Sequence, residues 1–320
     1  PMMKQGSITL KEASKKFYSK HDKKEINKYI LPVRDACNFL GELANSKRYK
    51  DLELLNYEYN VTFDMQFGAL CVKMPDKTMY VSFEGTDNYV SGWKEDFMMS
   101  YKFPTNAQIE AVNYLNKVVG LFSHKVYVGG HSKGGNLAVI ASMYCKRRVF
   151  KKIVNVYSND APGVRVNQLV SKQYSRMSKK LIQFVPRESF VGMLLYHQDN
   201  YVVVDSYKKF LMQHNALNWM VEDDHFVKCE LSEFSKKVEK ALLSWLKRYN
   251  DQEREEFVNI LFSVLSKAEV DDLTTIKQAK ISSILKILKE MKNINKEHRN
   301  ILIKGFMLLY NEWMVKENEK

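Results

Sequence analysis

A serine flanked by glycines is the clearest chemical signal in the sequence. The run Gly-His-Ser-Lys-Gly at residues 130–134 matches G-x-S-x-G, in which the serine occupies a tight turn between a strand and a helix. Glycines two residues to either side let the strand and helix approach closely, and the helix N-terminus lies behind the serine hydroxyl. A lysine that follows the serine does not fit the Walker order of a phosphate-binding loop. The pattern therefore predicts that Ser132 is a nucleophile.

Regular elements on both sides of Ser132 fit a strand–turn–helix unit. An apolar strand is predicted over residues 126–129, and an Ala- and Leu-rich helix over 136–145. Further strands are predicted over 67–74, 78–83, 153–157, 181–185 and 201–204, and helices over 24–45 and 106–122. Pro32 favours a kink or a break in the first of these helices. Strands that alternate with helices indicate an α/β fold with a largely parallel sheet.

The chain changes character from about residue 232. Apolar residues recur there at three- and four-residue steps in several successive stretches, which predicts three or four helices without strands. We therefore expect an α/β domain over residues 1–231 and an all-helical C-terminal region over 232–320.

The sequence around Ser132 resembles a known family. Residues 130–138 are similar to the corresponding turn of class 3 (fungal-type) lipases, and closer still to bacterial relatives called Mbeg1-like proteins. Four more blocks are similar, at residues 81–87, 92–97, 159–163 and 185–195, with Gln213, His214 and Trp219 further on. The likeness covers about residues 25–225. It implies an α/β-hydrolase fold and a serine ester hydrolase of the esterase or lipase type, with no cofactor and no metal.

Acyl transfer builds negative charge on a carbonyl oxygen, so the site needs N–H donors placed in advance. Lys133, which follows the nucleophile, is expected to supply one backbone N–H. By resemblance to the lipases, the Gly85–Thr86 segment supplies the second, and the Thr86 hydroxyl is a further donor. Glu84 stands where the family usually has arginine. The alternative interpretation of this segment is a plain turn at the end of a strand.

The base is expected among the seven histidines of the chain. In this class the chain order is serine, acid, histidine, which favours a histidine after Ser132. His214 lies on a loop after the strand predicted at 201–204 and matches the last block of the family. His197 and His225 are rivals, and a surface histidine without a role is the alternative interpretation for each.

The acid is expected to hold the histidine ring in the correct tautomer. Asp160 follows the strand predicted at 153–157, at the edge where catalytic loops lie. The class 3 lipases place their acid one strand later, where this chain has no aspartate but has Glu188 nearby. Asp160 is the first choice and Glu188 the second, with a simple turn residue before Pro162 as the alternative for Asp160.

The segment 89–103 is rich in aromatic residues and methionine and follows the expected oxyanion loop. It fits either a lid or acyl-binding wall, or a buried amphipathic helix. Apolar residues after Pro186, among them Phe190, Met193 and Leu195, extend the expected apolar wall. Substrates with a hydrophobic acyl group are therefore expected, in preference to peptides or sugars.

Composition limits the alternatives. The net charge of +13, from 50 Lys and Arg against 37 Asp and Glu, is spread along the chain without a nucleic-acid motif, so no nucleic-acid partner is expected. The four cysteines form no CxxC pair, and the start lacks the apolar run of a signal peptide, so a cytoplasmic location is expected. No membrane span is predicted, and peripheral contact with a membrane stays open. The second functional hypothesis is a catalytically inactive binding or scaffold module of the same fold.

Overall fold

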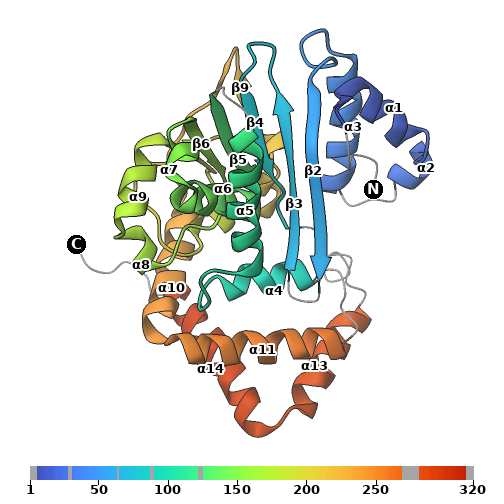
Figure 1. Cartoon of the computed structure of the whole chain (residues 1–320). Helices are drawn as coiled ribbons and strands as arrows, with labels where there is room; N and C mark the ends of the chain where they lie inside the picture. Colours follow the sequence, from blue (N-terminus) through green and yellow to red (C-terminus); the bar gives the residue numbers. More distant parts are fainter. Residues whose placement is uncertain are drawn as a thin grey trace.

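The computed structural model describes residues 6–27, 31–62, 65–86, 90–121, 125–268 and 281–314. Within these residues eight strands form one sheet whose spatial order follows the chain from β1 to β8 (Figure 1). The strands are Ile8–Thr9 (β1), Glu53–Thr62 (β2), Met65–Lys73 (β3), Met79–Phe83 (β4), Val126–His131 (β5), Ile153–Asn159 (β6), Leu181–Pro186 (β7) and Val202–Val204 (β8). Two short strands, Val221–Glu222 (β9) and His225–Phe226 (β10), form a separate hairpin.

The direction of the strands determines at which edge of the sheet the loops of the candidate site lie. We call this edge, at the carboxyl ends of the parallel strands, the functional edge. Strands β1 to β4 pair antiparallel, whereas β4 to β8 all pair parallel. The carboxyl ends of five neighbouring strands therefore lie along one edge, the edge at which loops of α/β proteins carry their sites. In Figure 1 this is the lower edge of the sheet.

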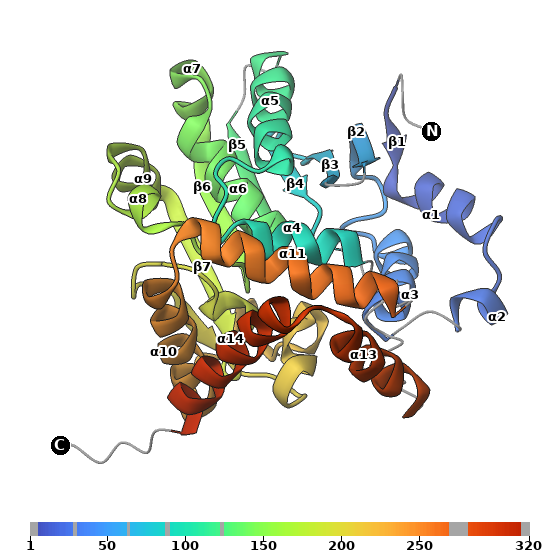
Figure 2. The ribbon, with the colours of Figure 1, turned by 90° about the horizontal axis from the view of Figure 1, so that it is seen from below.

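Several helices pack against the sheet. The chain places Leu10–Tyr18 (α1), Lys23–Ile26 (α2) and Leu31–Asn45 (α3) before β2, then Val90–Met98 (α4), Asn106–Leu121 (α5), Lys133–Tyr144 (α6), Arg147–Phe150 (α7), Val166–Leu169 (α8) and Lys172–Met177 (α9). Figure 2 shows α5, α6, α7 and α9 on one face, where α6 contacts α5 and α9. Of all the helices described, α5 and α6 make most of the helix–sheet contacts. Short 3₁₀ turns lie at Ser178–Lys180 (η1), Val191–Met193 (η2), Phe210–His214 (η3) and Ala216–Asn218 (η4).

The main core lies between the sheet and α6. Val128 and Val156 of adjacent strands are fully buried, and so are Leu137 and Ala141 of α6. Residues 133–143 of α6 are all buried, which is typical of a helix that is packed on every side. The helix that follows Ser132 is thus held firmly against the sheet.

The C-terminal region is helical and lies at the functional edge. Its helices are Glu233–Arg248 (α10), Asp251–Lys267 (α11), Ile281–Asn293 (α13) and Lys296–Met314 (α14). Figures 1 and 2 show α11 running along α4, and the rings of Phe97 in α4 and Phe262 in α11 lie 5.6 Å apart, edge to face. A second core forms there from Met98, Met99 and residues of α10, α11 and α14. No helix in the described ranges is both long and apolar enough to cross a bilayer.

The predicted α/β fold and the strands expected from residue 67 onward are confirmed, with shifts of one or two residues at their ends. The helix predicted over 24–45 is divided: α2 ends at Ile26, α3 begins at Leu31, and residues 28–30 lie outside the described part. The sequence analysis missed β1, β2 and the β9–β10 hairpin. In β2 the register shifts between Leu55 and Glu58, which interrupts the alternation that identifies a strand.

Candidate active site

Ser132 occupies the turn between β5 and α6. Its backbone has φ 57° and ψ −134°, a strained conformation for a residue other than glycine. The Ser132 N–H donates to the Asn159 carbonyl of β6 at 3.0 Å, so the turn stays tied to the sheet. The side chain stands at the carboxyl edge of β5, and the residue is 8% exposed.

Two glycines make this turn sterically possible. A Cβ atom on Gly130 would lie 2.3 Å from the carbonyl carbon of Gly134, and one on Gly134 would lie 2.2 Å from the Phe83 carbonyl oxygen. Either contact is too close for any side chain. The glycines of the G-x-S-x-G pattern are therefore required by the approach of α6 to β4 and β5.

His214 and Asp160 form a hydrogen-bonded pair. His214 ends η3, and its Nδ1 lies 2.6 Å from Oδ2 of Asp160, which directly follows β6. The other carboxylate oxygen of Asp160 accepts from Ser189 Oγ at 2.5 Å and from the Gly192 N–H at 3.0 Å. Asp160 is fully buried, and these three hydrogen bonds satisfy both of its carboxyl oxygens. A donating Nδ1–H leaves Nε2 of His214 as the nitrogen with a free lone pair.

The structure does not join Ser132 to this pair by a hydrogen bond. Within the described residues the His214 side chain bonds only to Asp160, and the Ser132 hydroxyl forms no bond to the ring. Hydrogen bonds between catalytic groups are often long without substrate and tighten in the reacting complex. The Ser132–His214 contact therefore stays a prediction.

His131 connects the turn that carries Ser132 to the turn that carries His214. Its Nε2 lies 2.5 Å from the His214 backbone oxygen, and the two rings are 4.4 Å apart. Burial, with the neighbouring His214, lowers the pKa of His131 to about 4, so the ring is neutral near pH 7. Because a carbonyl oxygen only accepts, Nε2–H of His131 is the donor. The residue before Ser132 thus holds the backbone of His214 in place.

The expected oxyanion loop passes close to the serine. A Cβ atom on Gly85 would lie 3.3 Å from Ser132 Cβ and 2.8 Å from the His131 carbonyl oxygen. The Thr86 hydroxyl donates to Asp96 Oδ2 at 2.7 Å and is therefore engaged in this structure. Residues 87–89 lie outside the described part.

Lys133 has a role that the sequence analysis missed. It was expected to contribute its backbone N–H, and as the first residue of α6 that N–H has no partner within the helix. Its side chain is also buried, and Nζ lies 3.2 Å from Glu95 Oε2 and 2.9 Å from the Gln66 carbonyl oxygen. The other Glu95 oxygen accepts from the Ala107 N–H at 3.0 Å. This buried ion pair fixes α4 to the turn that carries Ser132.

Asp96, next to Glu95, has an unusual environment. Burial raises the pKa of Asp96 to about 6, against the lowering effects of Lys133 and of the hydrogen bond from Thr86. Its Oδ1 is buried without a hydrogen-bond partner in the described part of the chain. Asp96 thus accepts the hydrogen bond that holds the Thr86 side chain, although burial disfavours the charged form of its carboxyl group.

The second candidate for the acid lies elsewhere in the site. Glu188 Oε2 accepts from the Phe210 N–H at 2.6 Å and from Gln213 Nε2 at 2.9 Å. The Glu188 N–H in turn donates to Gln213 Oε1 at 2.9 Å. Glu188 therefore holds both ends of η3, the turn that carries His214, and its hydrogen bonds do not include the His214 ring.

The rival histidines lie apart from the Asp160 pair. His225 in β10 is exposed and lies 3.3 Å from the Asp224 carboxylate. The side chain of His197 is buried and lies 3.5 Å from Glu239 of α10. Neither is hydrogen-bonded to Asp160.

Most of the segment 89–103 is described, except Tyr89. Val90–Met98 forms α4, and Met98, Met99 and Tyr101 are buried in the core shared with the C-terminal helices. Of the two interpretations given for this segment, the structure agrees with the buried helix. Met193 is also fully buried, against Val185, and is core packing where an apolar wall was expected.

The mixed sheet with parallel strands β4 to β8, the strained serine turn after β5 and the flanking helices define a lipase-like α/β-hydrolase fold. The family model described as Mbeg1-like matches residues 43–263. The chain belongs to the Mbeg1-like family. The match extends past residue 231 into α11, whereas the predicted division of the chain at residues 231 and 232 stays a prediction.

Among solved structures, three lipases illustrate the similarity. A Rhizomucor miehei lipase in a propeptide complex is 15% identical with a TM-score of 0.37, over 57% of this chain and 62% of its own. A fungal lipase–inhibitor complex is 14% identical, with a TM-score of 0.38, over 63% and 83%. A triacylglycerol lipase from Penicillium expansum is 11% identical, with a TM-score of 0.34, over 59% and 87%. The chain thus spans less than two thirds of the Rhizomucor miehei chain, and a search of curated proteins found no match.

Proposed function

We propose that the protein is a serine ester hydrolase of the esterase or lipase type. The observation that carries this is the bond of His214 Nδ1 to the buried Asp160 carboxylate at 2.6 Å, beside the strained turn of Ser132. Asp160 orients the ring and stabilises the imidazolium that forms when His214 takes a proton. The arrangement supplies a nucleophile, a base and an acid in the chain order of this fold class.

The reaction follows from these assignments. Ser132 Oγ attacks the ester carbonyl carbon while Nε2 of His214 accepts the hydroxyl proton. The backbone N–H groups of Lys133 and Thr86 stabilise the negative oxygen of the tetrahedral intermediate. The C–O bond to the leaving alcohol then breaks, and His214 returns the proton to that alcohol. Water, deprotonated by His214, hydrolyses the acyl-enzyme and regenerates Ser132.

We expect substrates with a hydrophobic acyl group. The family resemblance and the apolar residues of α4 support this class, although Met98 and Met99 are committed to the second core. Each well-buried methylene is worth about 0.8 kcal/mol, or roughly fourfold in rate. Activity on p-nitrophenyl esters is expected to rise from acetate toward butyrate or octanoate. A steady fall from acetate upward would show a small pocket.

A fluorophosphonate probe tests the proposal directly. Wild-type protein is expected to gain one covalent adduct at Ser132, and Ser132→Ala is expected to gain none. Ser178→Ala is a matched control, since Ser178 is a half-buried serine in η1 whose hydroxyl donates only to the Ser175 carbonyl oxygen. Failure of the wild type to react under conditions that label a control hydrolase would overturn the proposal.

A catalytically inactive binding module of the same fold is the second candidate. The unformed hydrogen bond between Ser132 and His214, with the C-terminal helices at the functional edge, favours this candidate. It predicts that folded wild-type protein binds an ester analogue without hydrolysing esters. Turnover that is lost in Ser132→Ala would exclude it.

A further inference from the structure

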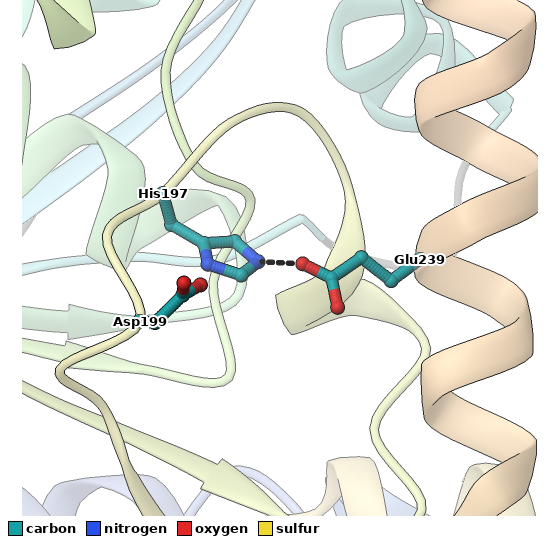
Figure 3. Close-up of side chains that lie close together, drawn as sticks. All are labelled: His197, Asp199 and Glu239. Carbon is teal, nitrogen blue, oxygen red and sulfur yellow. Dashed lines mark ion pairs between the residues drawn. The ribbon is translucent and has the colours of Figure 1, made fainter. Parts of the chain in front are cut away.

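Three metal-binding side chains meet away from the serine site. His197 and Asp199 lie on the loop between η2 and β8, and Glu239 reaches toward them from α10 (Figure 3). One nitrogen or oxygen atom from each residue lies within 4.8 Å of the other two. His197 Nε2 is 3.5 Å from Glu239 Oε1. Two carboxylates and one imidazole thus lie close together, with the His197 ring between the carboxylates in the view of Figure 3.

The histidine is buried without hydrogen bonds. Its side chain is only 3% exposed, and neither ring nitrogen has a hydrogen-bond partner in the described part of the chain. A buried polar atom left unpaired is unfavourable, so a ring with no hydrogen bond at Nδ1 among the described residues and only the Glu239 carboxylate 3.5 Å from Nε2 needs an explanation. The Tyr201 ring packs edge to face against His197, with the ring centroids 5.2 Å apart. A cation bound to one nitrogen would supply the missing partner.

The charges around the ring favour a cation. The Asp199 and Glu239 carboxylates each offer an oxygen within 4.8 Å of a nitrogen of the ring. An imidazole nitrogen that carries no proton has the lone pair that a metal needs. Asp199 is exposed and Glu239 is partly exposed, so the cluster is open to solvent on the side of the carboxylates. Two carboxylates leave a local excess of negative charge that a divalent ion would neutralise.

We propose that His197, Asp199 and Glu239 bind a divalent transition-metal ion of the Zn²⁺ type, with water in the remaining position. Imidazole with carboxylate ligands suits zinc and its neighbours, whereas Mg²⁺ and Ca²⁺ prefer oxygen ligands alone. Zinc bonds of about 2.0–2.2 Å place tetrahedral ligand atoms about 3.3 Å apart. The His197–Glu239 distance already fits this spacing. Asp199 is exposed and offers an oxygen within 4.8 Å of the other two ligand atoms, so a shift of at most about 1.5 Å would bring it to this spacing.

The position of the site gives the metal a structural role. Glu239 belongs to the first C-terminal helix, whereas His197 and Asp199 belong to the loop that leads into the sheet. A metal bound by all three would link α10 to the edge of the sheet at β8. Such a link stabilises the folded state by an amount that rises with the logarithm of the ratio of the metal concentration to its dissociation constant.

Zinc titration of the tag-free, full-length chain after chelator treatment tests the proposal. Competition with a chromophoric chelator is expected to show one tight equivalent of Zn²⁺, and Zn²⁺ is expected to raise the Tm. Mg²⁺ and Ca²⁺ at the same concentration are expected to leave the Tm unchanged. Asp199→Asn, at an exposed position, is expected to weaken zinc affinity by more than about tenfold, as loss of even an outer partner of a ligand does.

The matched control is Asp224→Asn, which removes the carboxylate next to the exposed His225 and is expected to bind zinc as the wild type does. Glu239→Gln keeps the shape of the side chain and is expected to weaken zinc binding as Asp199→Asn does. If the cluster is only a His197–Glu239 ion pair, Zn²⁺ will not shift the Tm, and Glu239→Gln alone will lower it. That result, or equal zinc affinity in the wild type and Asp199→Asn, would overturn the proposal. None of these measurements depends on esterase activity.

Discussion

The side chain of His131 holds the backbone of His214: its Nε2 lies 2.5 Å from the His214 carbonyl oxygen. His131 precedes the proposed nucleophile, and His214 is the proposed base. This hydrogen bond therefore links the turn that carries the nucleophile to the turn that carries the base. His131→Phe keeps a ring against His214 but removes the donor. We expect kcat to fall about 5- to 30-fold with little change in KM, the kinetic equivalent of about 1–2 kcal/mol.

His131→Gln restores a donor and separates positioning from simple loss of stability. It is expected to recover part of kcat, whereas the melting temperatures of the two variants should be similar. Equal activity in His131→Phe and wild type would show that the hydrogen bond does not position His214.

Asp160→Asn tests the acid. The amide cannot stabilise the imidazolium, and an NH₂ group turned toward Nδ1 favours the wrong tautomer of His214. In a serine protease the equivalent change lowers kcat about 10⁴-fold, and we expect a loss of the same order here. Steady-state kinetics on a p-nitrophenyl ester measures it, with circular dichroism to verify folding. A loss below tenfold would remove Asp160 from this role.

Glu188→Gln distinguishes the second candidate for the acid. Glu188 bonds to Phe210 and Gln213 at the two ends of η3, so it positions the turn that carries His214. The glutamine keeps one acceptor, and we expect a loss of kcat below about tenfold. Should Glu188→Gln lose more activity than Asp160→Asn, the two assignments would have to be exchanged.

Asp96→Asn is expected to change the pH dependence of stability. The pKa of Asp96 is raised by burial to about 6 from an ordinary value of 3.8. Its carboxyl therefore favours folding below about pH 4, and this contribution is lost as the pH rises through 6, by up to about 3 kcal/mol. Urea unfolding between pH 4 and 7 measures the loss. Asp96→Asn should abolish this part of the slope, whereas the exposed control Glu256→Gln should retain it.

A double-mutant cycle tests the contact between α4 and α11. Phe97 and Phe262 form an edge-to-face pair with ring centroids 5.6 Å apart. We expect Phe262→Ala to destabilise the chain by about 3 kcal/mol or more, because Phe262 is buried. The coupling energy with Phe97→Ala is expected to be about 0.5–1.5 kcal/mol. Purely additive effects would show that the two rings do not stabilise each other.

The serine turn could be predicted because its constraints are local. Gly130 and Gly134 are required by contacts within a few residues or with the adjacent strand, so the pattern appears in a short run of sequence. The choice of His214 rested on chain order and resemblance, and the choice of Asp160 on its place after a strand, because 54 residues separate the two in the sequence. The structure places these two together and leaves the Ser132–His214 bond unformed.

The side chain of Lys133 and the cluster at His197 could not be predicted in the same way. Lysine and glutamate usually lie at the surface, and only the fold shows that Lys133 and Glu95, 38 residues apart, are buried as a pair. His197, Asp199 and Glu239 form no spacing typical of a metal site, since Glu239 comes from a helix beyond the predicted domain boundary. In both cases tertiary packing brings the side chains together, and no local sequence pattern marks them as partners.

The packing of α11 on α4 sets an order of events during synthesis. Because a ribosome makes α4 long before α11, the sheet and its helices can assemble while the apolar face of α4 is still uncovered. Met98 and Met99 pack against residues of the C-terminal helices, so they lack these contacts until those helices have been synthesised. A nascent chain halted before α11 would therefore expose the apolar face of α4, which chaperones and other unfinished chains can bind. Completion of α11 covers this face and removes this route to aggregation.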